Sequence, residues 1–86
     1  MPYLKSFDKS TLEHITTQIL MSDLKGPGDL NYLFTILIKK YIKLKGESYQ
    51  TYNDCVGALQ ACSMELYRRK VGIYEDQKIK SNGDVY

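Results

Sequence analysis

The chain has 86 residues, of which 43% are hydrophobic and 26% charged, a composition typical of one small globular domain rather than of a disordered segment. Its net charge of +2 is too close to neutral to indicate nucleic-acid binding by charge alone. A domain of this size buries only roughly 64% of the surface of its unfolded chain, so we expect residues 1–86 to form one small helical domain that self-associates. Eight tyrosines against two phenylalanines suit half-buried positions, interfaces and ligand pockets.

No apolar run approaches the roughly 18 to 20 residues that span a bilayer, so we expect no membrane association. The first eight residues hold no apolar stretch that could act as a signal peptide, which favours a cytoplasmic protein. Cys55 and Cys62 are then expected to be reduced. On one helix they would lie about 10.5 Å apart, too far for a disulfide, and we expect both to be small buried apolar residues.

The first predicted helix covers residues 10–24. The segment from Ser10 to Glu13 fits a capping box, and apolar residues then recur at helical spacing. Two glycines and a proline at 26–28 end this pattern.

The second predicted helix covers residues 29–45, with Asp29 as its N-cap and Gly46 as its C-terminal stop. Six residues share its main apolar face: Leu30, Leu33, Phe34, Leu37, Tyr41 and Leu44. Isoleucines beside that face make the helix apolar on more than one side, which predicts that it is covered on more than one side.

The third predicted helix covers residues 48–82 and is kinked or broken near Gly72. Its first stripe consists of Tyr52, Val56, Leu59, Cys62 and Leu66. Asn82 and Gly83 stop the helix and leave a short C-terminal tail. The sequence therefore predicts an all-α fold of three helices that assembles as a helical homo-oligomer.

Enzyme chemistry has little support in the sequence. The single histidine, His14, has no partner spaced to form a catalytic triad, and the glycines at 26 and 28 lack the length of a phosphate-binding loop. Zinc-finger spacing is absent as well. We expect no enzymatic activity, no cofactor and no metal site.

The run from Glu65 to Lys70 is the better candidate for a binding site. Arg68 and Arg69 diverge by about 100° on a helix, so that one can pair internally while the other faces a ligand. A structural salt bridge from Glu65 to Arg69 is the simpler alternative. The lysines at 39–45 are in the same way either a solvated helix end or a surface for an anionic partner.

Polar residues near the predicted helix starts, among them Asn31 and Asn53, form a second candidate cluster. The two starts are separated by roughly 25 Å along the second helix, so one chain does not easily bring these residues together. An antiparallel dimer could. We therefore expect any composite site to lie between subunits.

Three segments resemble a family of small, functionally uncharacterised phage and prophage proteins: GDLNY at 28–32, ELYRR at 65–69 and YEDQKIKSNGDVY at 74–86. The start Met1-Pro2-Tyr3 is also similar to that family. The resemblance covers nearly the whole chain and implies a phage setting, hence host cytoplasm, but no mechanism. Because the polar segment 74–86 is characteristic of the family, it is expected to close over a ligand or a neighbouring subunit.

We expect a non-enzymatic phage accessory protein that sequesters an anionic small molecule, such as a nucleotide second messenger of antiphage defence. Nine residues are candidates for the ligand site: Asn31, Asn53, Arg68, Arg69, Tyr74, Lys78, Asn82, Asp84 and Tyr86. The arginines and Lys78 would meet phosphates, while Tyr74 and Tyr86 would stack on bases. A protein-binding adaptor or inhibitor of a host protein is the alternative, and nucleic-acid binding is a weaker one.

Overall fold

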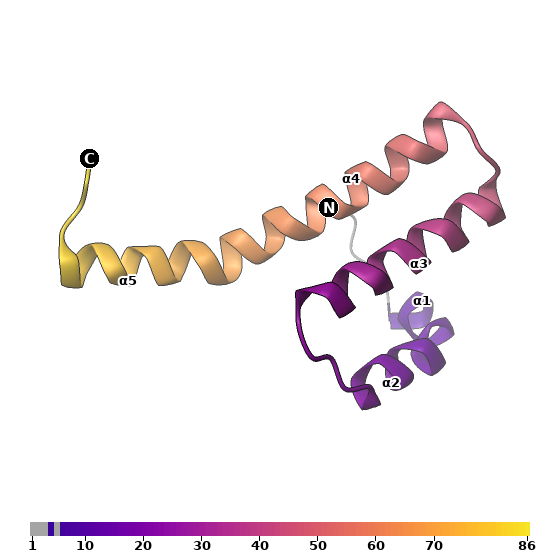
Figure 1. Ribbon diagram of the computed structural model, residues 1–86, viewed down its shortest axis with the longest axis horizontal. Helices are drawn as coiled ribbons and strands as arrows, with labels where there is room; N and C mark the ends of the chain where they lie inside the picture. Colours follow the sequence, from indigo (N-terminus) through magenta and orange to yellow (C-terminus); the bar gives the residue numbers. More distant parts are fainter. Residues whose placement is uncertain (1–3, 5) are drawn as a thin grey trace. The chain divides into compact units, whose positions relative to one another are not determined.

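The computed structural model describes residue 4 and residues 6–86, with the side chains of residue 4 and residues 9–86. This part of the chain contains helices and no strand (Figure 1), which confirms the all-α prediction. The elements are α1 (Ser6–Thr11), α2 (Glu13–Met21), α3 (Pro27–Lys45), α4 (Tyr49–Leu66), the π-helical turn η1 (Tyr67–Val71) and α5 (Gly72–Asn82). The chain divides into two compact units, one ending at Gly46 and the other running from Glu47 to Tyr86. The opening motif Met1-Pro2-Tyr3 lies outside the described residues.

The predicted helix start at Ser10 is wrong. Ser10 lies inside α1, where its backbone is already helical, so its side chain cannot take the N-cap position of a helix that begins there. The chain instead breaks at Leu12, whose backbone departs from helical geometry at φ −103° and ψ 5°. α2 follows without a side-chain cap and ends at Met21, three residues before the predicted end. His14 lies on α2 and is exposed.

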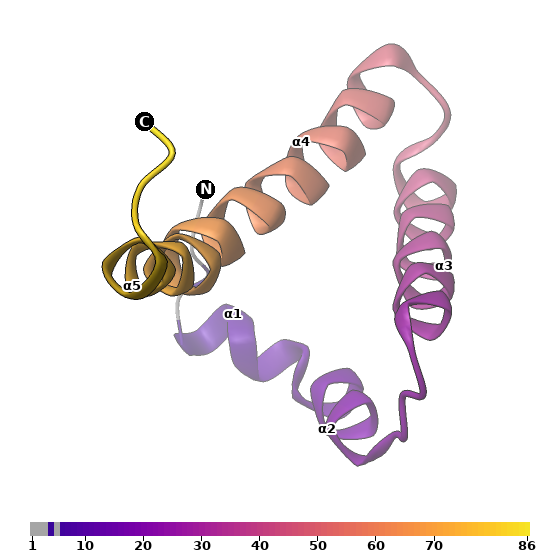
Figure 2. The ribbon, with the colours of Figure 1, turned by 60° about the vertical axis from the view of Figure 1, so that its left-hand side comes forward.

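α3 begins two residues before the predicted start, because Pro27 occupies its first turn and Gly26 its N-cap. Asp29 is therefore inside the helix, and its carboxylate accepts a hydrogen bond from the backbone N–H of Lys25 at 2.8 Å. Figure 2 shows the course of the linker between α2 and α3, and this hydrogen bond ties the linker to the start of α3. The predicted end at Lys45 is confirmed, with Gly46 at φ +87°, where glycine is favoured.

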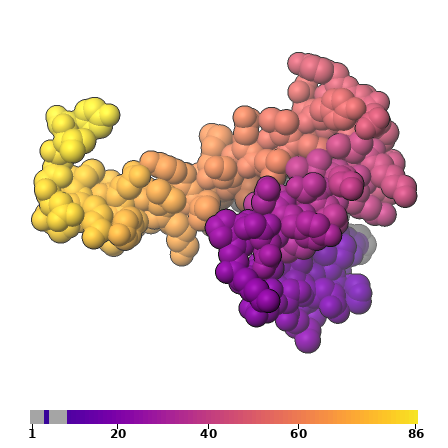
Figure 3. All heavy atoms as spheres, in the orientation of Figure 1, coloured from indigo at the N-terminus to yellow at the C-terminus, as the bar shows by residue number. Residues whose placement is uncertain are grey.

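α4, η1 and α5 follow one another without a gap and form a single helical rod from Tyr49 to Asn82 (Figure 1). The predicted start near Ser48 is confirmed, and Ser48 caps the helix, because its hydroxyl oxygen accepts the N–H of Thr51 at 3.1 Å. The predicted kink near Gly72 is confirmed as the π-helical turn that precedes this glycine. The predicted end is also confirmed: Gly83 follows at φ +90°, and the tail projects from the end of α5 (Figure 3).

The predicted core faces are not buried. Among the residues whose side chains are described, no apolar residue is buried, and Thr51 is the one buried polar residue, at 4% exposure. Leu30, Leu37 and Leu44 on the main apolar face of α3 are all exposed. Cys62 is exposed and Cys55 half-buried, so the prediction of two buried cysteines is wrong, although both thiols are free as predicted. The apolar stripes are present at the predicted positions, but no other part of the described chain buries them.

No helix in the described part of the chain is long and apolar enough to cross a membrane.

Candidate functional site

The candidate site is built on the π-helical turn in the middle of the rod. At its end the N–H of Gly72 donates to the carbonyl oxygen of Tyr67, five residues back instead of the four of an α-helix. Such a turn contains one residue more than an α turn, so every residue after it is rotated relative to the residues before it. A Cβ added at Gly72 would lie 3.2 Å from the carbonyl oxygen of Tyr67, which makes this position tight for any larger residue. π turns are rare and are frequent at functional sites, so the residues around this one are the first to consider.

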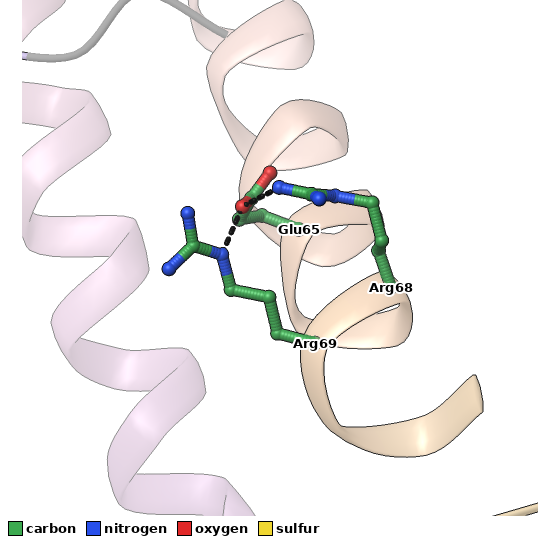
Figure 4. Close-up of polar contacts among 3 residues, drawn as sticks. All are labelled: Glu65, Arg68 and Arg69. Atoms are coloured by element: carbon green, nitrogen blue, oxygen red, sulfur yellow. Dashed lines mark hydrogen bonds and ion pairs between the residues drawn. The ribbon is translucent and has the colours of Figure 1, made fainter. Parts of the chain in front are cut away.

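Glu65 holds both arginines of the turn. Arg68 Nη2 lies 2.6 Å from Glu65 Oε1, and Arg69 Nε contacts the same oxygen. Figure 4 shows the two guanidinium groups approaching this carboxylate from different sides. The expectation that one arginine pairs internally while the other faces a ligand is therefore replaced by two arginines that share one carboxylate. Their side chains remain 67% and 60% exposed, so solvent and solutes reach both.

Tyr67 and Glu75 form a second contact across the π turn. The Tyr67 hydroxyl donates to the Glu75 carboxylate, with distances of 2.9 Å to Oε2 and 3.1 Å to Oε1. Residues eight apart on a regular α-helix are rotated by about 80° from each other, whereas residues seven apart share a face. The extra residue of the π turn brings the pair onto one face. The hydrogen bond and the negative charge of Glu75 raise the pKa of Tyr67, which keeps its hydroxyl protonated as a donor.

Five further candidates lie on α5 and the tail. The ammonium of Lys78 lies 5.5 Å from the centroid of the Tyr74 ring, within the range of a cation–π contact. Asn82 is the last residue of α5. In the tail, the Asp84 carboxylate accepts the backbone N–H of Tyr86 at 2.9 Å, so that this segment forms a local turn. The structure thus brings Tyr74 and Lys78 together, and separately Asp84 and Tyr86.

The two asparagines belong to different units. Asn31 lies on α3 in the unit that ends at Gly46, and its carbonyl oxygen accepts the Thr35 hydroxyl at 2.9 Å. Asn53 lies exposed on α4 in the other unit.

The charged cluster on the π turn consists of Glu65, Tyr67, Arg68, Arg69 and Glu75. Glu65 and Tyr67 were not among the site residues predicted from the sequence. The sequence predicts Glu65 only as a salt-bridge partner, and it includes Tyr67 only as a member of the run from Glu65 to Lys70. The spacing of Tyr67 and Glu75 carries no signal on a regular helix, so only knowledge of the π turn could have paired them.

The cluster has the chemistry of anion binding. A guanidinium presents a planar fork of five N–H donors to phosphate or carboxylate, and two of them side by side can hold a bound carboxylate and a second anion at once. Among the described residues, no three His, Cys, Asp or Glu side chains gather in a way that could hold a metal ion.

The comparisons with known proteins agree with the resemblance to an uncharacterised family. No curated protein and no solved structure matches the chain. One family model matches residues 1–85, nearly the whole chain, and it is described as a domain of unknown function (DUF6899). The protein thus belongs to this family, DUF6899, through a match that includes both the apolar helices and the charged cluster on the π turn.

Proposed function

We propose that the protein is a non-enzymatic phage or prophage accessory protein that binds and sequesters an anionic small molecule in the cytoplasm of its host. A nucleotide second messenger of antiphage defence is the ligand class that best combines the phosphate-binding and aromatic side chains of the rod. The ligand binds in a homo-oligomer, at or beside the contact between subunits.

The observation that carries this proposal is the pair of exposed arginines that converge on one oxygen of Glu65. A carboxylate oxygen is a chemical analogue of a phosphate oxygen, so the place where both guanidinium groups already meet one is a place where they can meet the other. Glu65 also cancels one of the two positive charges, and Lys70 in the same turn restores it. The cluster thus keeps a positive charge for an incoming anion.

The aromatic part of the ligand is assigned to Tyr74 and Tyr86. Tyr74 lies in the first turns of α5, and Lys78 over its ring places an ammonium where a phosphate next to a stacked base can reach it. Tyr86 is fully exposed at the end of the tail. Asn82 and Asp84 between them supply polar groups for the edge of a base.

Isothermal titration calorimetry with cyclic oligonucleotides and cyclic ADP-ribose isomers tests the proposal. We expect one of these anions to bind at micromolar concentration, and Arg68→Ala or Arg69→Ala to weaken its binding by at least about tenfold, which is about 1.4 kcal/mol. Lys80→Ala is the matched control, because it removes a basic side chain of the same rod outside the cluster, and it should change the affinity by less than about twofold.

The purely structural reading of the arginines makes a different prediction. If Glu65 holds them only to stabilise the helix, both alanine variants and Glu65→Gln lower the unfolding temperature together, and no anion binds to any of them. Failure of every anionic nucleotide to bind the wild-type protein would therefore contradict the proposal.

Binding to a host protein is the second candidate function, and it is favoured by the end of α2. Leu20 and Met21 are adjacent apolar residues with 80% and 78% of their surface exposed. Pull-down from host lysate separates the two functions, since a protein that sequesters a small molecule recovers no stoichiometric partner. Nucleic-acid binding through the lysines of α3 and the arginines of η1 is the weaker alternative, and it predicts an affinity that falls steeply with salt.

A further inference from the structure

One stripe of the rod stays in phase from α4 into α5 because of the π turn. On α4 it contains Tyr52, Val56, Leu59 and Leu66, at the spacings of three, four and seven that keep residues on one helix face. Regular α-helical spacing would continue the stripe to Lys70 and Ile73. The extra residue of the π turn moves these positions to Val71 and Tyr74, and the next turn adds Lys78. We call these seven residues the seam: Tyr52, Val56, Leu59, Leu66, Val71, Tyr74 and Lys78.

The seam has the same spacing from either end. From Tyr52 the steps to Val56 and Leu59 are four and three residues, and from Lys78 the steps back to Tyr74 and Val71 are also four and three. The pairs Tyr52 with Lys78, Val56 with Tyr74 and Leu59 with Val71 therefore share one midpoint, residue 65. A surface that repeats itself about its own midpoint fits a two-fold symmetric contact with an identical copy.

Most of the seam is apolar and uncovered. Tyr52, Val56, Leu59, Leu66 and Tyr74 are each between 40% and 59% exposed. An isolated helix in water is marginal without the packing of its apolar face, so this surface needs a partner.

The length of the rod selects that partner. α4, η1 and α5 contain 18, 5 and 11 residues, which gives a rod about 50 Å long. α3 has 19 residues and α2 has 9, so they reach about 28 Å and 13 Å and neither can follow the whole seam. A second rod matches it from end to end. A strip about 50 Å long and 10 Å wide on each copy buries about 1,000 Å² in total, which is the least area expected of a specific interface.

The charges of the rod favour an antiparallel arrangement. Residues 49–60 carry a single charged residue, Asp54, whereas residues 67–82 carry five basic and two acidic residues. A parallel pair would place Lys78 beside the Lys78 of the other copy. An antiparallel pair places the basic half of each rod against the nearly uncharged, slightly acidic half of the other.

We propose that two copies of the chain pair antiparallel along the seam, with the two-fold axis at residue 65 and Tyr74 of each copy packed against Val56 of the other. This pairing specifies the homo-oligomer of the proposed function. It rests on the self-association in that proposal and not on the ligand. Arg68 and Arg69 lie close to the midpoint, on the side of the rod that Glu65 occupies and away from the seam, so substitutions of these two arginines test anion binding apart from pairing. Tyr74 and Lys78 belong to the seam as well as to the proposed ligand site, so pairing is measured without ligand.

Disulfide trapping between chains tests the orientation. In a background with Cys55→Ser and Cys62→Ser, a chain carrying Val56→Cys is mixed with a chain carrying Tyr74→Cys and oxidised without ligand. We expect the mixed disulfide to dominate over both symmetric ones. Dominance of the Val56→Cys homodimer would show a parallel pair and overturn the proposal.

Sedimentation of the ligand-free protein tests the seam itself. We expect wild-type dimers at micromolar concentration, and Leu59→Asp should raise the dissociation constant at least about tenfold. Met64→Asp is the matched control: Met64 is an exposed apolar residue of the same helix, rotated by about 140° from Leu59, and its variant should still dimerise. A wild-type monomer, or equal effects of the two variants, would overturn the proposal. If the wild type is a monomer but binds nucleotides, the seam and the homo-oligomer of the proposed function are both wrong, while the sequestration of an anionic ligand stands.

Discussion

The two halves of the rod, α4 on one side and η1 with α5 on the other, have the same secondary structure but differ in how it is stabilised. α4 begins with a side-chain cap at Ser48 and carries two charged residues, Asp54 and Glu65. η1 and α5 have no such cap, because they continue from a helix, and their residues 67–82 carry seven charges. The second half is instead held by side-chain contacts: ion pairs of its two arginines with Glu65, a hydrogen bond from Tyr67 to Glu75 and a cation–π contact of Lys78 with Tyr74.

A continuous helix can therefore change its surface chemistry within one turn. The π turn lies where the charges begin, and its extra residue decides which side chains of α5 continue the apolar face of α4. A local hydrogen bond at Ser48 starts the first half, whereas the second half depends on its connection to the first. Four experiments test this comparison.

The largest effect is expected from changing the register between the halves. Insertion of one alanine after Lys70 rotates α5 by about 100° and removes Val71 and Tyr74 from the seam. The dissociation constant of the dimer should therefore rise by at least about tenfold. Deletion of Lys70 is the control, because it turns the π turn into an α turn and leaves the seam in phase. Sedimentation of both variants measures the effect. Equal behaviour of insertion and deletion would show that the register is unimportant.

The next effect concerns the start of the rod. Ser48→Ala removes the hydroxyl oxygen that accepts the N–H of Thr51, and the cost in free energy of unfolding should be about 1 kcal/mol. Ser81→Ala at the other end removes a contact of 3.3 Å to the Lys78 carbonyl and should change stability by less than about 0.5 kcal/mol. Urea unfolding followed by circular dichroism compares the two. A larger loss from Ser81→Ala would reverse the assignment of the anchored end.

Glycine substitutions compare the interiors of the two halves. Gly57 in α4 has open space around an added Cβ, so Gly57→Ala should raise the free energy of unfolding by about 0.5 to 1 kcal/mol. At Gly72 the added Cβ meets the carbonyl oxygen of Tyr67 at 3.2 Å, and Gly72→Ala should gain less or lose stability. Thermal unfolding measures the stability of both variants. An equal gain in stability would show that the π turn leaves room for a Cβ at Gly72.

The smallest expected effect is on the pKa of the Tyr67 hydroxyl. Because Glu75 raises the pKa of Tyr67, this contact stabilises the fold below the ordinary tyrosine pKa of about 10, and the contribution is lost as the pH rises through the raised pKa. Glu75→Gln should bring the pKa of Tyr67 down toward its ordinary value, as measured by carbon NMR of labelled tyrosine rings. Asp76→Asn is the control, since the adjacent carboxylate is rotated by about 100° and should leave that pKa unchanged.

Local signals in the sequence predicted the parts of the fold that depend on near neighbours. Ser48 before a helical pattern, and Gly46 and Gly83 after one, mark boundaries that the structure confirms, because a cap or a positive φ is decided within four residues. The same kind of signal failed at Ser10, where a capping box lies inside a helix that starts earlier. A motif of four residues does not show whether the chain before it is already helical.

By itself the sequence determined that this protein is helical, where its two long helical segments lie and which residues form their apolar stripes, because helical periodicity is written in residue spacing. The three-dimensional structure decided that one of those segments contains a π turn, that Glu65 holds two arginines and not one, and that Tyr67 lies on the same face as Glu75. One extra residue in a turn rotates everything after it. No spacing rule that assumes a regular helix can anticipate that rotation.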